Sequence, residues 1–360
     1  MFSRPPLGFV CIGFIAGLAP VPLHAWDYDG HRMVNQVALA SLPREYPQFV
    51  HAVANAERLA FLAGEADRWR NVPDLPLKQY NGVDHYCDME YIPEAGLDWA
   101  TVPSFRYDFV VQFAAGRAAN AKRFAPIDPA KNTDHSREWP GLAPWAITEY
   151  YGKLRAAFSY LKVFEELGTP DEIMNAQANV VYLMGVMGHY VGDCAQPLHT
   201  TKHHNGWVGE NPKGYTTWPG FHAWIDGGFV AKAGIKPAEL APRVRTAEPI
   251  ALAARSDGRD PMFVAAVDYL EAQHRLVEPL YQLEKEGKLG NSERPVTDEA
   301  RVLISGQLLK GGQMLGAIWL TAYRNAIPDT YLRASLIRRQ TGASPGSASG
   351  PVSAPPAQKG

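Results

Sequence analysis

The hydrophobic positions along this 360-residue chain recur with helical spacing. Residues 31–42 carry apolar side chains every three or four positions and are followed by Pro43, which predicts a helix that ends there. Thr169-Pro170-Asp171-Glu172 has the form of a capping box and predicts the start of a long helix that runs to Asp193. Further helices are expected over residues 148–167, 261–286 and 297–325, and near 106–123.

No long run of alternating apolar and polar residues predicts a sheet. We therefore expect an all-α fold, with one mostly helical domain over residues 26–340. Residues 90–147 are rich in Pro, Trp and Gly and predict an irregular excursion from it. Residues 341–360 are mostly Gly, Ser, Ala and Pro, which predicts a disordered tail.

Three glycines, at positions 185, 188 and 192, interrupt the predicted helix that ends at Asp193. Glycine inside a helix costs stability, so we expect another backbone or a metal to approach closely there.

The first 25 residues have the pattern of a secretory signal, with Arg4 before an apolar stretch too short to span a bilayer. Leu23-His24-Ala25 is the expected cleavage site, and an uncleaved membrane anchor is the less favoured alternative. We therefore expect a secreted or periplasmic protein, with no stable membrane insertion and no obligate protein partner. The net charge of −2 provides no strong basic field, so a phosphate substrate would need bound cations.

Export would leave two cysteines in the mature chain, Cys87 and Cys194, each within two residues of a candidate metal ligand. If those ligands converge, an oxidising compartment would permit a disulfide between them. We favour the disulfide over the alternative of two buried free thiols.

Histidine and aspartate gather in a pattern typical of metal ligands. His189 and Asp193 are four residues apart on a predicted helix, His199 follows Pro197, and His222 and Asp226 repeat the four-residue spacing. Residues four apart project from one helix face, and imidazole with carboxylate suits a borderline cation such as zinc. A lone histidine is more often a satisfied core residue, but this set favours a metal site.

Trp26 would become the first residue after cleavage. Its free α-amine and its carbonyl could then chelate a metal, and His31 would add an imidazole. The alternative is that Trp26 only packs against the end of a helix.

At these positions the chain resembles the trinuclear-zinc, single-strand-specific nucleases and 3′-nucleotidases of fungi, plants and bacteria. The resemblance spans residues 26 to about 230 and rests on highly specific motifs. The matching segments are Trp26-Asp-Tyr-Asp-Gly-His31, Ala66-Asp67-Arg-Trp-Arg70, His85-Tyr86-Cys87-Asp88, His189-x-x-x-Asp193, Gln196-Pro197-Leu198-His199 and His222-x-x-x-Asp226.

The resemblance implies the helical fold of this family and of zinc-dependent phospholipases C, with three zinc ions. The first zinc would be held by Asp67, His85, His189 and Asp193. The second would be held by His199, His222 and Asp226. The third would be held by Trp26, His31 and a bridging Asp193.

The resemblance also implies substrates and catalytic residues. Single-stranded DNA or RNA and 3′-nucleotides would be cleaved at the P–O3′ bond, giving 5′-phosphate ends. Asp67 and Arg70 are the implied catalytic residues, with Arg70 stabilising charge on the phosphoryl oxygens. A surface ion pair is the alternative role for Arg70.

Tyr86 and Asp88 would line a base pocket, the ring by stacking and the carboxylate by accepting hydrogen bonds. Asp88 could instead orient a ligand histidine. Two departures from the family bear on the substrate cleft: the long gap from His85 to His189, and the loop of residues 202–211, where we expect His203 and His204 to be solvated.

Two other functions compete. Zinc-dependent bacterial phospholipases C, acting on phospholipid head groups, share the ligand order. The short spacing from Trp26 to His31, together with Asp226 and Arg70, favours the nuclease. A non-catalytic zinc-binding protein would have closed coordination and no turnover.

Overall fold

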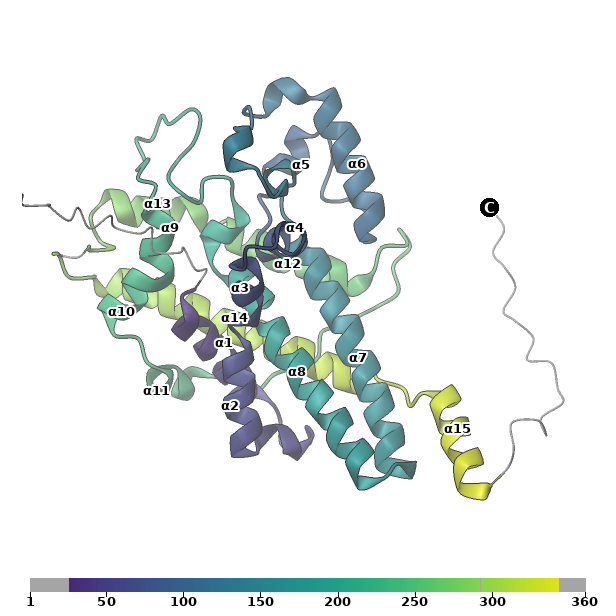
Figure 1. Ribbon diagram of the computed structural model, residues 1–360. Helices are drawn as coiled ribbons and strands as arrows, with labels where there is room; N and C mark the ends of the chain where they lie inside the picture. The colour runs from purple at the N-terminus through teal and green to yellow at the C-terminus, as the bar shows by residue number, and fades with distance from the viewer. Residues whose placement is uncertain (1–25, 292, 343–360) are drawn as a thin grey trace, which may run out of the picture.

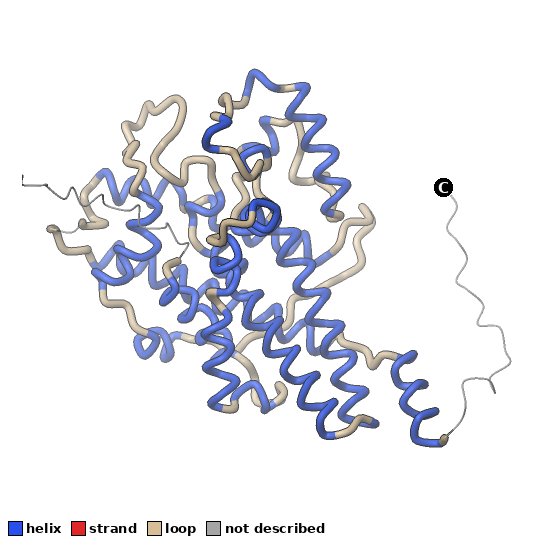
Figure 2. The backbone as a smooth tube through the Cα atoms, in the orientation of Figure 1, coloured by secondary structure: helices blue, strands red, loops and turns tan. Residues whose placement is uncertain are grey.

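A computed structural model of the chain describes residues 26–291 and 293–342. Within these residues the backbone consists of helices and loops, without a strand (Figure 2). The predicted all-α class is therefore confirmed. The predicted signal peptide, residues 1–25, and residues 343–360 of the predicted tail lie outside the described residues.

Four long helices form the central bundle of the molecule (Figure 1). They are α1 (Tyr28–Ser41), α7 (Ala143–Leu167), α8 (Pro170–Ala195) and α14 (Asp298–Arg324). α1 and α8 both pack against α14, and α7 runs along α8. Their facing sides bury large apolar residues such as Val34, Phe158, Met184 and Trp319. Burial of this apolar surface is the main stabilising contribution to the bundle.

Shorter elements surround this bundle. The other α-helices are α2 (Val53–Leu62), α3 (Glu65–Arg70), α4 (Leu75–Gly82), α5 (Tyr91–Glu94), α6 (Arg106–Ala119), α9 (Phe221–Ala223), α10 (Val230–Ala233), α11 (Pro237–Leu240), α12 (Pro261–His274), α13 (Val277–Lys285) and α15 (Thr330–Thr341). The 3-10 turns are η1 (Gln48–His51), η2 (Val83–His85), η3 (Ala121–Arg123), η4 (Pro129–Lys131), η5 (Ser136–Glu138), η6 (Pro197–Thr200) and η8 (Ala241–Arg243), and η7 (Trp224–Phe229) is a π-helix. None of the helices in this part of the chain is long and apolar enough to cross a membrane.

The start of α8 has the predicted capping box. The Thr169 hydroxyl accepts from the Glu172 backbone N–H at 3.3 Å, and the Glu172 carboxylate accepts from the Thr169 N–H at 2.8 Å. The close approach expected at the α8 glycines is also found. A Cβ at Gly188 would lie 1.7 Å from Oδ1 of Asn35, so only glycine lets α1 approach α8 here.

Two expectations about helix ends are wrong. The stretch 261–286 is two helices, because the chain turns at Arg275 and Leu276 between α12 and α13. The turn lets both helices bury their apolar residues, Leu270 on α12 and Leu280 on α13. In addition, α15 includes Thr341, which we had assigned to the tail.

The excursion at 90–147 contains α6 and most of a small apolar cluster, to which Val83, Phe263 and Val267 also contribute. Phe109 and Phe113 of α6 are fully buried, and the Phe109 ring stacks on Trp145 of α7 at 4.0 Å between centroids. The excursion is thereby anchored to the long helix α7, whose first residues, from Ala143, fall within the predicted range. Its other segments are the short helix α5, turns and loops.

Candidate metal centre

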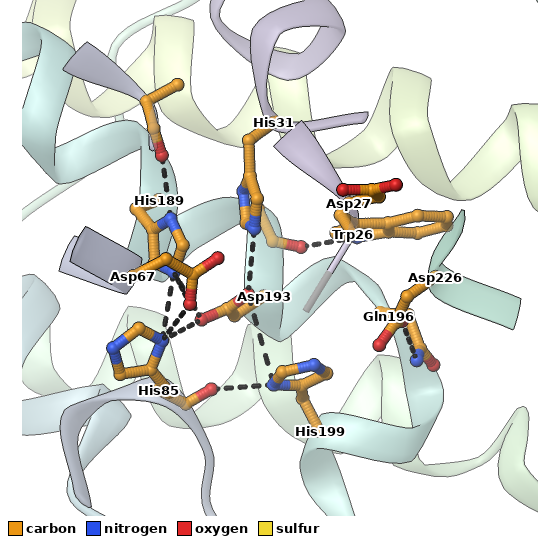
Figure 3. A network of polar contacts seen from close by, with 12 residues as sticks. Trp26, Asp27, His31, Asp67, His85, His189, Asp193, Gln196, His199 and Asp226 are labelled. Atoms are coloured by element: carbon orange, nitrogen blue, oxygen red, sulfur yellow. Dashed lines mark hydrogen bonds and ion pairs between the residues drawn. The ribbon is translucent and has the colours of Figure 1, made fainter. Parts of the chain in front are cut away.

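Eight of the candidate ligands converge from segments that are far apart in the sequence (Figure 3 shows seven of them). The eight are His31 from α1, Asp67 from α3, His85 from η2, His189 and Asp193 from α8, His199 from η6, His222 from α9 and Asp226 from η7. All except His222 are buried. Because burying ionisable groups is costly without strong partners, so dense a cluster indicates a specific chemical role.

The first group consists of His85, His189 and Asp193, with Asp67 at its edge. Nδ1 of His85 lies 2.9 Å from Nε2 of His189 and 3.0 Å from Oδ2 of Asp193. Asp67 Oδ1 lies 3.7 Å from Nε2 of His189. His189 Nδ1 lies 2.7 Å from the carbonyl of Ala63, to which it donates, so its Nε2 presents a lone pair to the group.

The second group consists of His199, His222 and Asp226. The Nε2 atoms of the two histidines are 2.9 Å apart, and His222 Nε2 lies 2.9 Å from Oδ2 of Asp226. His199 Nδ1 is 2.8 Å from the His85 carbonyl, so its Nε2 also presents a lone pair. Gln196 donates to Oδ1 of Asp226 at 2.7 Å and holds the carboxylate in place.

His31 lies beside the first group, and Asp193 contacts both His31 and His85 of that group. Nε2 of His31 is 3.3 Å from Oδ1 of Asp193, and its ring stacks on His189 at 3.9 Å. Nδ1 of His31 is buried and has no hydrogen-bond partner within the described chain. The distances also group His31 with Asp67 and His189, whereas the predicted third site combined His31 with Trp26.

Trp26 lies against α8, the helix that carries His189 and Asp193. Its indole N–H donates to the carbonyl of Gly192 at 2.8 Å, and the side chain is fully buried. This contact is the packing role that we had considered as the alternative. Chelation by its α-amine stays a prediction, because that nitrogen is joined to residue 25, which lies outside the described residues.

Burial keeps most of these imidazoles neutral, which is the state that binds a cation. It lowers the pKa of His85 to about 3 and that of His222 to about 4, and the charge of Arg70 adds to both shifts. Burial also lowers the pKa of His31 and of His199. The pKa of His189 is raised despite burial, because the Asp193 and Asp67 carboxylates favour its charged form.

The carboxyl groups of Asp193 and Asp226 differ in the direction of their pKa shifts. Burial raises the pKa of Asp193, but His189 and His199 outweigh it and hold that pKa well below its usual range. Burial raises the pKa of Asp226 to about 7, although His222 lies only 2.9 Å away. A neutral His222 provides little charge to compensate that carboxylate. A bound cation would stabilise the ionised form of Asp226.

The donor set fits a borderline divalent cation. The Nε2 lone pairs of His189 and His199 each point at a second imidazole nitrogen and a carboxylate oxygen. A single proton can be shared by only two of these three atoms at a time. A cation between them would bind all three. Unsatisfied buried polar atoms cost about 1–3 kcal/mol each, so this arrangement favours cation binding.

A cavity of about 310 Å³ opens onto this cluster. Its wall includes four of the ligand side chains, those of His85, His199, His222 and Asp226. Arg70, Tyr86 and Asp88, which were predicted to act on substrate, also line it, whereas the predicted catalytic Asp67 does not. Arg70 also forms an ion pair with Asp67 at 2.9 Å, so the ion pair considered as an alternative exists inside the site. The carboxylate of Asp88 is buried and makes no hydrogen bond to a candidate ligand histidine in the described chain.

Several residues of the site were not predicted. Asn81 places its side-chain amide 3.2 Å from Nε2 of His85, and Gln196 orients Asp226. His203 is not solvated, contrary to expectation, and His204 is half-buried. His203 is buried and stacks on Trp207 at 3.9 Å, while His204 lines the cavity, its ring 5.9 Å from that of His222.

Cys87 and Cys194 are buried free thiols in the structure, so the favoured disulfide is absent from it. Burial raises the pKa of each thiol well above its usual range. The thiolate form of each cysteine is therefore strongly disfavoured.

Comparison with known proteins leaves the family open. No family model matches the sequence. One segment is 27% identical over 145 residues to coatomer subunit beta′-1 of Arabidopsis thaliana. That match covers 35% of this chain and spans only 15% of the coatomer subunit, so it shows no shared family.

Proposed function

We propose that the protein is a zinc-dependent phosphoesterase that hydrolyses the P–O3′ bond of single-stranded nucleic acids and 3′-nucleotides. The observation that carries the proposal is the convergence of eight His and Asp side chains in one cluster, four of which line a cavity that also contains an arginine and an aromatic ring. Such a cluster would hold more than one cation. A phosphodiester needs that positive charge, which the chain's net charge of −2 lacks.

Three sets of residues would hold zinc. His85, His189, Asp67 and Asp193 would hold one ion, and His199, His222 and Asp226 a second. His31 and Asp193 would hold a third, with the Trp26 amine after cleavage of the signal. Zinc at such sites supplies positive charge for phosphoryl oxygens and makes water a better nucleophile near neutral pH.

The protein's own groups would position the substrate. Arg70 lines the cavity together with His85 and His222, so its charge is available beside both ligand groups. Its ion pair with Asp67 would orient the guanidinium toward phosphoryl oxygens placed between the groups. Tyr86 would stack on a base, and Asp88 would accept hydrogen bonds from the base edge.

The test is a comparison of substrates with zinc-loaded mature protein. We expect hydrolysis of single-stranded DNA and release of phosphate from 3′-AMP, with no turnover of phosphatidylcholine vesicles. Turnover of the lipid without hydrolysis of either nucleotide substrate would reject the proposal in favour of a phospholipase C. Absence of turnover on all three would support a non-catalytic zinc-binding protein.

A matched pair of variants examines the role of Arg70. Arg70→Ala should lower kcat by about 100-fold or more, because the donor acts on charge that develops in the transition state. Arg68→Ala is the control, since Arg68 is on the same helix but pairs with Glu65. Equal effects of the two substitutions would contradict the assigned role.

A further inference from the structure

The irregular excursion contributes its own residues to the cavity beside the metal cluster. Ser136 and Arg137 of the turn η5, with Trp139 directly after it, line this cavity together with four of the ligand side chains. Arg137 is therefore a second guanidinium in the cavity that contains Arg70. Under the proposed function, the metal cluster and Arg70 would bind one phosphate, so the second arginine needs a separate explanation.

This wall of the cavity is firmly joined to the segment that carries His85, Tyr86 and Asp88. The Asp88 N–H donates to the carbonyl of Pro140 at 2.6 Å, and the Ala143 N–H donates to that of Tyr86 at 3.2 Å. Gly141 lies between them with φ +90°, and a Cβ there would be 2.1 Å from the Tyr86 carbonyl oxygen. Only glycine permits this approach, which fixes η5 relative to the predicted base pocket.

The side chain of Arg137 is oriented but not neutralised. Its Nε donates to the carbonyl of Lys131 at 2.7 Å, and its backbone N–H donates to Oδ1 of the buried Asn132 at 3.0 Å. Among the described residues, no hydrogen bond or ion pair engages its Nη1 or Nη2. The positive charge is close enough to act on Tyr86 and His204, which both line the cavity. The guanidinium thus keeps its paired donors for an anion.

We propose that Arg137 binds the 5′-phosphate of the nucleoside whose 3′-phosphate is cleaved. The inference rests on the proposed function. A nucleotide within a strand carries phosphates at its 3′ and 5′ positions, and the metal cluster with Arg70 would bind the first. With the base against Tyr86, the 5′-phosphate is the anion left for the neighbouring Arg137. The protein then prefers substrates with phosphates on both sides of the nucleoside over 3′-mononucleotides.

The test compares two small substrates that differ only in that phosphate. Phosphate release from adenosine 3′,5′-bisphosphate and from 3′-AMP is measured with zinc-loaded wild type, Arg137→Gln and Arg123→Gln. Arg123 is the control because it carries the same charge but lines a different cavity. Isothermal titration of 5′-AMP and of adenosine into the same proteins adds a readout that does not require turnover.

We expect wild type to favour the bisphosphate by about tenfold in kcat/KM, the size of one charge-assisted interaction. Arg137→Gln should lose that preference, with a loss in kcat/KM about tenfold larger on the bisphosphate than on 3′-AMP, and should bind 5′-AMP about tenfold more weakly but adenosine equally. Arg137→Lys should keep part of the preference, and Arg123→Gln should keep all of it. Equal wild-type turnover of both substrates, or equal losses on both in Arg137→Gln, would overturn the inference. Failure of wild type to release phosphate from either compound would instead reject the proposed function, and the inference with it.

Discussion

The Nε2 atoms of His199 and His222 lie 2.9 Å apart, and the second also lies 2.9 Å from the Asp226 carboxylate. His199 uses its Nδ1 to donate to the His85 carbonyl, which directs its Nε2 lone pair at His222. Without a cation, a single proton on His222 can serve either His199 or Asp226. With a cation, all three atoms become ligands, so this contact links the packing of the site to metal binding.

Metal content is the first prediction. Mature protein beginning at Trp26 should contain about three zinc ions per chain by elemental analysis, one for each proposed site. Removal by chelator should lower the unfolding temperature, because ligands that bind only the folded state add about 4 kcal/mol at a thousandfold excess over Kd. One zinc per chain would favour a structural role.

Asp193→Asn should remove more than one ion, since the carboxylate contacts both His31 and His85. We expect zinc content to fall from about three to about one and activity to fall at least a thousandfold. Circular dichroism would confirm that the variant is folded. Asp171→Asn, at the exposed start of the same helix, is the control and should retain its zinc. A variant Asp193→Asn with full zinc content would refute the bridging role.

A residue retained before Trp26 should lower the zinc content by one ion per chain. Keeping a methionine there turns the α-amine into an amide, which is a poor metal ligand. Elemental analysis of the extended and the mature chains should differ by about one ion. Equal zinc content and equal activity would show that Trp26 acts only through its packing and its indole hydrogen bond to Gly192.

Gln196 is expected to act through Asp226. Gln196→Ala removes the donor 2.7 Å from Oδ1 of Asp226 and should weaken zinc binding by about tenfold or more in a chelator competition. Gln340→Ala is the control, because Gln340 is exposed on α15 and its amide donates to the carbonyl of Leu167. Unchanged zinc affinity in Gln196→Ala would mean that Asp226 is positioned by other contacts.

The capping box of α8 gives a prediction on stability and pH. Hydrogen bonds from Arg339 and the Thr169 N–H lower the pKa of Glu172 to about 2. A lowered carboxyl pKa stabilises the fold above the unfolded value, near 4.5, and this contribution is lost as the pH falls toward 2. Glu172→Gln should therefore lower the unfolding temperature at pH 7 but not near pH 2. The exposed Glu248→Gln should have no effect at either pH.

The sequence predicted those parts of the molecule that depend on local pattern. The capping box at Thr169 and the four-residue spacing of His189 and Asp193 are local, so both were visible in advance. The break at Arg275 was not, because continuous apolar spacing does not reveal a change of direction that two packed faces require. His204 belongs to a loop and Arg137 to the short turn η5, and only tertiary contacts bring such residues to a cavity. Loop position therefore has to come from the structure.

The most direct measurement is end-group analysis of a single-stranded oligonucleotide digested by the zinc-loaded mature protein. If water attacks phosphorus and the P–O3′ bond breaks, each cleavage should create a 3′-hydroxyl on the upstream fragment and a 5′-phosphate on the downstream fragment. The products should vanish on chelation and return when zinc is added back. Products that carry 3′-phosphates, or digestion that is unaffected by the chelator, would contradict the account.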